Sequence, residues 1–361
     1  MDANATEPLR PEAREAMRDA LALTGNPSSV HAEGRAARRV LEEAREAIAR
    51  RFRALPRNVV FTSGATEANA LALHALGAGR RVIASAVEHD SVLAAAPGAV
   101  LVPVDGQGVV DLDALTHALD AAGPALVCLM LANNETGVIQ PVAEAVALCR
   151  RHGAWLHVDA VQAAGRMAVF LNALGADSLA LSSHKLGGPT GAGALLFADE
   201  GGAPAPLIRG GGQERGWRAG TPALAAIAGF AAAAEAGGDA ARLAPLRDGI
   251  ERAAKEAGAL VAGADAARIP NTACLVLPGL PAMAQVMALD LAGFAVSAGA
   301  ACSSGKVSAS HVLAAMGLGP DAGAAIRVSL PWNATDADAD AFAAAYRDMV
   351  ARMRRAVVLA R

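Results

Sequence analysis

The feature that most constrains the fold is an alternation of short apolar runs with helix-like segments between residues 58 and 197. The runs are mostly continuous rather than alternating in polarity, as expected for strands buried on both faces. Strands that alternate with helices predict an α/β fold, with an open, mostly parallel seven-stranded sheet covered by helices on both sides. The strands are expected at residues 59–62, 81–85, 100–104, 126–131, 155–159, 178–181 and 193–197, and helices at 65–76, 112–121 and 142–152.

The second half of the chain has a different composition. A Gly- and Pro-rich stretch at 201–206 precedes a polar loop, and an Ala-rich helix then ends at Gly237 and Gly238. A further helix at 239–257 leads into a smaller α+β unit, and Thr335 is the expected N-cap of the last helix. The small unit's strands are expected at 273–277, 294–297 and 326–330. We expect a large domain at 9–238 and a small domain formed by 1–8 and 239–361.

Length, charge and composition narrow the function classes. The chain has 361 residues and a formal net charge of -3, which gives no basis for a nucleic-acid or anionic-membrane partner. Apolar residues make up 53% of the chain but aromatic residues only 3%, so Ala and Gly account for its unusually apolar composition. A chain with this apolar content is not intrinsically disordered. Gly and Pro interrupt its long uncharged runs, and its N-terminus lacks the pattern of a signal peptide. Four sparse cysteines without metal-type spacing favour a reducing, cytoplasmic location and no metal site.

A phosphate site is predicted where the first expected strand runs through Ser63 and Gly64 directly into a helix. Such a turn directs backbone N–H groups and the positive end of a helix dipole at one point, which suits a phosphate group. Ala65 and Thr66 open this helix. An ordinary capped helix is the alternative interpretation, and this motif alone does not decide between them.

Lys185 follows another expected strand and precedes a Gly-Gly-Pro sequence that prevents a helix. It is therefore placed at the carboxyl edge of the sheet, where ligands bind in open α/β folds. A lysine that loses solvation there has a lowered pKa and can react with an aldehyde. The alternative is a surface lysine in a loop. The neighbouring His184 and the preceding strand weaken this interpretation.

Three further polar residues follow apolar strands. Asp159 ends one strand, and a carboxylate at that position requires a cation, such as the protonated ring nitrogen of a pyridoxal cofactor, or several donors. His89 is suited to stacking on a planar cofactor and to proton transfer. Asn134 offers an amide at the same sheet edge. The alternatives are a helix N-cap for Asp159, a structural role for His89 and a simple turn around Asn134.

One cysteine differs from the others. Cys128, Cys149 and Cys274 lie in apolar strands or on a helix and are interpreted as packing residues. Cys302 instead lies in a loop of Gly, Ala and Ser residues beside Lys306, where a thiol can be reactive. An incidental loop cysteine is the alternative.

Together these motifs resemble the group I cysteine desulfurases, pyridoxal-phosphate enzymes of the NifS/IscS type within the class V aminotransferase family. The resemblance extends from Asp2 to about Met353 and keeps the family's motif order. The Ala-Cys-Ser-Ser-Gly sequence around Cys302 and the following 310–313 segment favour group I. The resemblance implies a fold-type I transferase fold with pyridoxal 5'-phosphate as cofactor.

The resemblance also implies roles for individual residues. Lys185 is similar to the lysine that holds the cofactor, Asp159 to the acid that pairs with its ring nitrogen, and His89 to the histidine that stacks on the ring. Gln162 corresponds to the group near the phenolic oxygen of the cofactor, and Arg327 corresponds to the group that binds the substrate carboxylate. The phosphate is expected to contact Ala65, Thr66, Ser182 and His184, together with Thr221 of the neighbouring subunit, and Asn134 is expected to hold the substrate.

The implied reaction converts L-cysteine to L-alanine. The Cys302 thiolate attacks the substrate sulfur and becomes a persulfide, which a sulfur-acceptor or scaffold protein receives for iron–sulfur cluster or other cofactor assembly. The resemblance also implies a homodimer and leaves open a transient iron–sulfur cluster at Cys302. It does not identify the acceptor pathway.

Two other functions remain alternatives. One is another pyridoxal-phosphate enzyme of the same fold, such as an aminotransferase or a selenocysteine lyase, which would not need Cys302 in a loop. The other is a sulfur-transfer partner without catalysis, which would not need Lys185, Asp159 and His89 to be intact.

Overall fold

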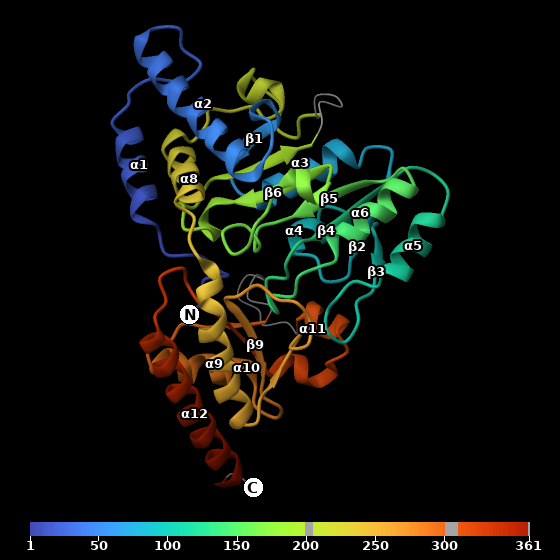
Figure 1. The fold of residues 1–361 in the computed structure, drawn as a ribbon, viewed down its shortest axis with the longest axis vertical. Helices are drawn as coiled ribbons and strands as arrows, with labels where there is room; N and C mark the ends of the chain where they lie inside the picture. Colours follow the sequence, from blue (N-terminus) through green and yellow to red (C-terminus); the bar gives the residue numbers. More distant parts are fainter. Residues whose placement is uncertain (199–204, 300–309, 360–361) are drawn as a thin grey trace.

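The large sheet has seven strands in the order β1-β7-β6-β5-β4-β2-β3, as predicted from the alternating runs (Figure 1). The structure is a computed structural model and describes residues 1–198, 205–299 and 310–359. Every adjacent pair is parallel except the two that β7 makes with β1 and β6. The strands are β1 (Val59–Thr62), β2 (Arg81–Ser85), β3 (Val100–Val102), β4 (Ala125–Met130), β5 (Trp155–Asp159), β6 (Ser178–Ser182) and β7 (Gly193–Phe197).

Helices cover both faces of this sheet, so its central strands are buried throughout. Side chains alternate between the faces: Val127 and Leu129 join one core, while Leu126 and Cys128 join the other. The first core includes α2, α6 and α8, and the second is built on α3. The helices of this part are α1 (Pro11–Leu21), α2 (Ala32–Phe52), α3 (Ala65–Leu76), α4 (Asp90–Leu93), α5 (Leu112–Asp120), α6 (Val142–Arg151), α7 (Leu171–Leu174) and α8 (Leu224–Ala236).

A smaller antiparallel sheet forms the second part of the molecule, with the order β10-β11-β9-β8. Figure 1 shows α9 and α12 running together along it, with the C-terminus at the far end of α12. Its strands are β8 (Leu260–Val261), β9 (Thr272–Val276), β10 (Ser297–Ala298) and β11 (Ala325–Ser329). Its helices are α9 (Leu243–Glu256), α10 (Ala282–Leu291), α11 (His311–Ala315) and α12 (Asp336–Leu359).

Short 3₁₀ turns connect several of these elements. They are η1 (Pro56–Asn58), η2 (Ser183–Lys185), η3 (Gln213–Gly216), η4 (Ala240–Arg242) and η5 (Gly319–Ala324).

The N-terminal segment joins the two parts. Asp2 pairs with Ser329 of β11, and the Ala3 N–H donates to the Ser329 carbonyl at 3.1 Å. Residues 4–7 then reach the loops of the large sheet, where the Glu7 N–H donates to the His184 carbonyl at 2.9 Å. Figure 1 accordingly places the N-terminus between the two sheets. The division into domains at 9–238 and at 1–8 with 239–361 stays a prediction.

Several predicted boundaries needed correction. The strand predicted at 100–104 ends at Val102, before Pro103, which has no N–H to donate to a ladder. The strand predicted at 294–297 is wrong at its start, because the Phe294 N–H caps α10 by donating to the Leu289 carbonyl at 2.9 Å. Thr335 is confirmed as the N-cap of α12, since its Oγ1 accepts from the Asp338 N–H at 3.3 Å.

Two predicted absences concern membranes and metals. Within the described ranges, none of the helices combines the length and apolar character needed to span a membrane. The same ranges contain no group of three or more His, Cys, Asp or Glu side chains arranged to hold a metal ion.

Candidate active site

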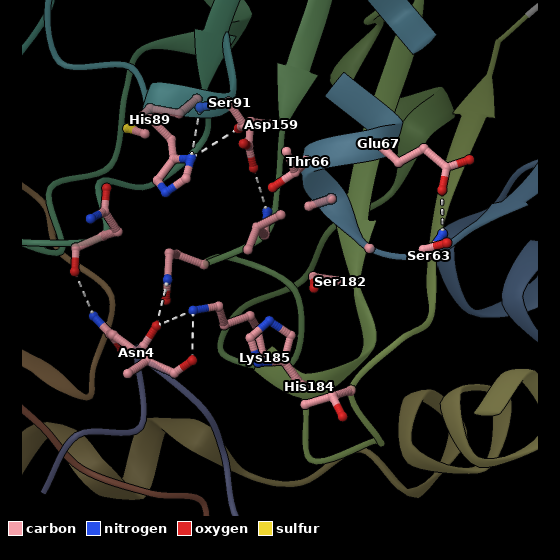
Figure 2. A pocket seen from close by; sticks show the side chains of 18 of the residues that line it. Asn4, Ser63, Thr66, Glu67, His89, Ser91, Asp159, Ser182, His184 and Lys185 are labelled. Atoms are coloured by element: carbon pink, nitrogen blue, oxygen red, sulfur yellow. Dashed lines mark hydrogen bonds between the residues drawn. The ribbon is translucent and has the colours of Figure 1, made fainter. Parts of the chain in front are cut away.

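One cavity of about 700 Å³ lies between the carboxyl ends of the large sheet's strands, the N-terminal segment and β11. Figure 2 shows His89, Ser91 and Asp159 gathered at one end and Lys185 beside Asn4 and His184 at another. Of the residues predicted from the sequence, the cavity is lined by Ala65, Thr66, His89, Asn134, Asp159, Gln162, Ser182, His184, Lys185 and Arg327. These residues come from distant elements, and the fold brings them together around one space.

Lys185 ends the η2 turn that follows β6, so its side chain leaves the sheet edge toward the N-terminal segment. Its Nζ donates to the backbone carbonyls of Asn4 at 2.5 Å and Ala5 at 2.9 Å (Figure 2). The Gln162 Nε2 also donates to the Asn4 carbonyl, at 3.1 Å. The N-terminal segment therefore positions the amine at the cavity wall through neutral acceptors.

Asp159 is the last residue of β5 and is almost fully buried. Its Oδ1 accepts from the Val161 N–H at 2.9 Å, and its Oδ2 accepts from the Asn69 side-chain amide at 2.7 Å. The alternative of a helix N-cap is wrong, because a turn rather than a helix follows Asp159. A carboxylate fixed at both oxygens at the cavity wall is suited to binding a cationic ring nitrogen.

His89 caps the short helix α4 and lines the cavity. Its Nδ1 accepts from the Ser91 N–H at 3.0 Å and lies 2.9 Å from the Ser91 hydroxyl. Because Nδ1 is an acceptor, the neutral ring carries its proton on Nε2. The structure thus combines the predicted position at the site with a local capping role.

The first turn of α3 forms another wall of the cavity through Ala65 and Thr66. The N–H groups of a first turn lack carbonyl partners within their helix, so they are suited to binding an anion. The turn before the helix packs closely against β7, where a Cβ on Gly193 would lie 2.7 Å from the Gly64 backbone. Only a glycine at position 193 permits this approach.

Glu67 stabilises the turn before α3. Its Oε2 accepts from the Ser63 N–H at 2.8 Å, and its Oε1 accepts from Arg218 Nε at 2.7 Å. Burial opposes ionisation of Glu67, but the hydrogen bonds from Arg218 and Ser63 outweigh it and lower the pKa of the carboxyl. Glu67 therefore stays charged and holds the Ser63 backbone in place.

His184 lies next to Lys185, and its Nδ1 is 3.0 Å from the Thr6 hydroxyl. Burial, followed by the positive charges of Lys185 and Arg166, lowers the pKa of His184 to about 4. At neutral pH the ring is uncharged and can act only as a neutral hydrogen-bonding group.

Arg327 of β11 enters the cavity from the small sheet and is 3% exposed. Its Nη2 donates to Asp2 Oδ1 at 2.7 Å and to the Ser297 hydroxyl at 3.1 Å, and its Nη1 donates to the Asn134 carbonyl at 3.2 Å. Its buried Nε has no hydrogen-bond partner within the part of the chain that the structure describes. A guanidinium with a donor to spare is suited to a substrate carboxylate.

Two predicted site residues are not found in the cavity. Thr221 is exposed and lines a separate space of about 90 Å³ with Ser63 and Gly191. Cys302 lies outside the described residues, and so does Lys306 beside it. The other three cysteines are buried as predicted, and burial raises the pKa of Cys149 and of Cys274 to about 12.

Sequence reasoning missed several residues that hold the site together. Asn4, Asn69 and Ser91 each hydrogen-bond a residue of the predicted site or lie beside it, but only the fold brings them there. For Asn69 the available signal was its position in the first turns of the helix after the phosphate turn, on the face toward the sheet. No comparable signal marks Asn4.

Comparison with known proteins shows which chains this one is similar to. The sequence model of the family described as aminotransferase class-V matches residues 1–342. A cysteine desulfurase of Cereibacter sphaeroides is 44% identical, over 94% of this chain and 92% of that protein. The crystal structure of a NifS-like protein from Rickettsia africae has a TM-score of 0.89 and 34% identity, covering 96% of this chain and 98% of that one. The protein SspA, solved in complex with cysteine, has a TM-score of 0.81 and 28% identity, covering 92% and 99%.

Proposed function

We infer that this chain, which belongs to the class-V aminotransferase family and within it to the cysteine desulfurases, removes sulfur from L-cysteine at the cavity beside Lys185. The observation that carries this proposal is the meeting of Lys185, Asp159 and the first turn of α3 around one cavity. A reactive amine, an acid and an anion-binding turn are three different requirements of one cofactor type. Their convergence from three separate elements favours an enzyme over a carrier protein without catalysis.

The residues around the cavity fit pyridoxal phosphate. Asp159, fixed at both oxygens, would hold the protonated ring nitrogen, while Gln162 would lie near the phenolic oxygen. Neutral His184, with Ser182 and the first turn of α3, would hold the phosphate. When bound, pyridoxal phosphate supplies an aldehyde for Lys185 and an electron sink for the substrate Cα.

Other lining residues are assigned to the ring and the substrate. His89 would cover the ring and offers a proton at Nε2, because Nδ1 is held by Ser91. Arg327 would bind the substrate carboxylate with Asn134 beside it, since a guanidinium matches a carboxylate in charge and shape. These assignments orient L-cysteine with its carboxylate toward the small sheet.

Cys302 is proposed as the sulfur acceptor within the chain. Its thiolate attacks the substrate sulfur, so that an S–S bond forms while the substrate C–S bond breaks and its electrons remain on carbon. Protonation of that carbon yields L-alanine, and Cys302 carries the transferred sulfur as a persulfide. No external oxidant is needed, because L-cysteine and a thiol give L-alanine and a persulfide in balance.

We further propose a cytoplasmic homodimer that transfers its sulfur to an acceptor or scaffold protein for iron–sulfur cluster or other cofactor assembly. The exposed position of Thr221, outside the cavity of its own chain, supports a contact with the phosphate of the neighbouring subunit. Light scattering of the purified protein tests the dimer. A monomer with full activity would overturn this assignment of Thr221.

The test of the proposed function is single-turnover chemistry with purified protein, pyridoxal phosphate and L-cysteine. The expected products are equal amounts of L-alanine and of persulfide on Cys302, with mass spectrometry locating the persulfide. Cys302→Ala should abolish persulfide while retaining the bound cofactor's visible absorbance, and Lys185→Ala should lose the absorbance of the wild-type protein. Alanine formation that is unchanged in Cys302→Ala would refute the persulfide step, and a wild-type protein that binds no cofactor would refute the function.

A further inference from the structure

Behind the cavity wall, a fully buried asparagine connects the two groups assigned to the cofactor ring. Asn69 of α3 donates from Nδ2 to Asp159 Oδ2 at 2.7 Å and to the Ser91 hydroxyl at 2.8 Å. The Ser91 hydroxyl lies 2.9 Å from His89 Nδ1. Both amide hydrogens of Asn69 are therefore in use, one toward Asp159 and the other toward His89 through Ser91.

The other end of the Asn69 amide faces His157 of β5. Asn69 Oδ1 is 3.0 Å from His157 Nε2, and His157 Nδ1 is 2.8 Å from the Ser178 hydroxyl. Asn69, His157 and Ser178 are each 0% exposed. The array thus continues from the cavity wall through α3 into two adjacent strands of the sheet.

The protons in this array can be assigned from the acceptors. Burial lowers the pKa of His157 to about 3, so the ring is neutral and carries one proton. Asn69 Oδ1 is only an acceptor, so His157 Nε2 must be the donor, and His157 Nδ1 then accepts from the Ser178 hydroxyl. Every donor between Ser178 and Asp159 has one defined direction.

Asp159 determines which end of the Asn69 amide faces it, because its Oδ2 accepts from Asn69 Nδ2. If the amide turned over, its oxygen would lie 2.7 Å from an Asp159 oxygen, and His157 would have to move its proton to Nδ1 and donate to Ser178 instead. The contact between two acceptor oxygens would be repulsive, and a buried polar group left without a partner is costly. Asn69 therefore keeps its donors toward Asp159 and Ser91, and His157 anchors the amide from the other side by donating to its oxygen.

We propose that Asn69 is a positioning residue that fixes the orientations of Asp159 and His89 together, and that the His157 N–H anchors the Asn69 amide by donating to its oxygen. The inference rests on the proposed function, because it gives the two oriented groups a common task at the cofactor ring. Asn69 touches neither the cavity nor a ligand in it, and it acts through Asp159 and Ser91.

The test uses cofactor binding and visible circular dichroism, which report how the ring is held without measuring turnover. Asn69→Ala should raise the Kd for pyridoxal phosphate about tenfold or more, as expected for losing a hydrogen bond to a charged group, and should change the visible dichroism. Asn58→Ala is the matched control, because Asn58 is likewise a buried asparagine, at 1% exposed, but lies in η1, away from the array. The control should retain the wild-type Kd and spectrum.

A second pair of variants keeps the proposal testable if Asn69→Ala does not fold. His157→Phe keeps a ring but removes the donor, so it should weaken cofactor binding and alter the dichroism, whereas His157→Gln retains a donor and should restore part of both. Equal effects of Phe and Gln, or a wild-type Kd and spectrum in Asn69→Ala, would overturn the inference. A wild-type protein that fails to bind pyridoxal phosphate would instead refute the proposed function.

Discussion

The carboxylate of Asp2 lies 2.7 Å from Arg327 Nη2, an ion pair between residues that are 325 positions apart. The Arg327 side chain is 3% exposed and that of Asp2 is 26% exposed, so the pair is partly shielded from water. The Ser297 hydroxyl donates to the second Asp2 oxygen at 2.9 Å. The N-terminal segment thus fixes the guanidinium that is proposed to bind the substrate carboxylate.

The first prediction concerns this pair. Asp2→Asn keeps the shape of the side chain but replaces a charge-assisted hydrogen bond with a weaker one, so Arg327 is held less firmly. We expect the KM for L-cysteine to rise about 3- to 10-fold with little change in kcat, corresponding to about 1 kcal/mol. Steady-state kinetics measure this directly. A lower KM would show instead that Asp2 competes with the substrate for Arg327.

The parts of the site that follow strands were predictable from the sequence. Lys185, Asp159 and His89 each follow an apolar run, and parallel strands deliver their carboxyl ends to one edge, so their meeting at one cavity follows from the topology. The strands themselves were recognisable because burial on both faces leaves continuous apolar runs. The antiparallel direction of β7 was not predicted, because a continuous apolar run has the same pattern in a parallel strand and in an antiparallel one.

The parts of the site that depend on long-range packing were not predictable. Asn4 reaches the cavity because residue 2 pairs with residue 329 at the end of β11, and no local pattern encodes that contact. Asn69 and His157 resemble ordinary core positions until the register of α3 over β5 is known. Strands of two residues, such as β8, are too short to leave a periodic signal.

The second prediction concerns Glu135, which contacts residues on both sides of the 300–309 segment. The Ser310 hydroxyl donates to Glu135 Oε2 at 2.6 Å, and a Cβ on Gly299 would lie 3.0 Å from the same oxygen. Glu135→Ala removes this common contact, so we expect persulfide formation on Cys302 to slow several-fold while cofactor binding is unchanged. Rapid alkylation followed by mass spectrometry measures the rate. Exposed Glu144→Ala is the control, and equal rates in both variants would contradict the prediction.

The third prediction concerns the buried pair of Arg45 and Glu214. Two hydrogen bonds of 2.8 Å join them, and the Phe61 N–H also donates to Glu214 at 2.9 Å. Glu214 has φ 47° and ψ 38°, a backbone conformation that these contacts must stabilise. Glu214→Gln removes the buried carboxylate and leaves Arg45 only the half-exposed Glu42, whose Oε2 accepts from Arg45 Nε at 3.1 Å. We therefore expect the free energy of unfolding to fall by about 3 kcal/mol, the lower end of the cost of breaking a buried ion pair.

Denaturant unfolding of Glu214→Gln tests this value against a matched exposed pair. Glu15→Gln removes one of the two carboxylate partners of Arg18, where both side chains are about 70% exposed, and should change stability by less than about 1 kcal/mol. A Glu214→Gln protein as stable as the Glu15→Gln control would show that the buried pair contributes specificity rather than stability.

The fourth prediction concerns Glu88, which is fully buried beside the site. Its Oε1 accepts from the Met130 N–H at 2.6 Å, while Oε2 has no partner among the described residues. Burial raises the pKa of Glu88 to about 8, and the Met130 N–H opposes this while the Asp159 charge adds to it. The folded protein therefore binds a proton at neutral pH that the unfolded chain, with an ordinary glutamate pKa near 4.5, has released.

This difference in bound protons between the folded and unfolded states determines how the free energy of unfolding changes with pH. Because the native state holds more protons between about pH 4.5 and 8, stability falls as the pH rises through that window and levels off above it. Glu88→Gln mimics the protonated acid, so its free energy of unfolding should exceed that of the wild type by a few kcal/mol at pH 8.5 but differ little at pH 4.5, at about 1.4 kcal/mol per pH unit. Denaturant unfolding of both proteins at several pH values isolates the contribution of Glu88, since all other titrating groups are shared. Parallel curves for the two proteins would show that Glu88 is ionised in the folded state and that its buried charge is stabilised by another group.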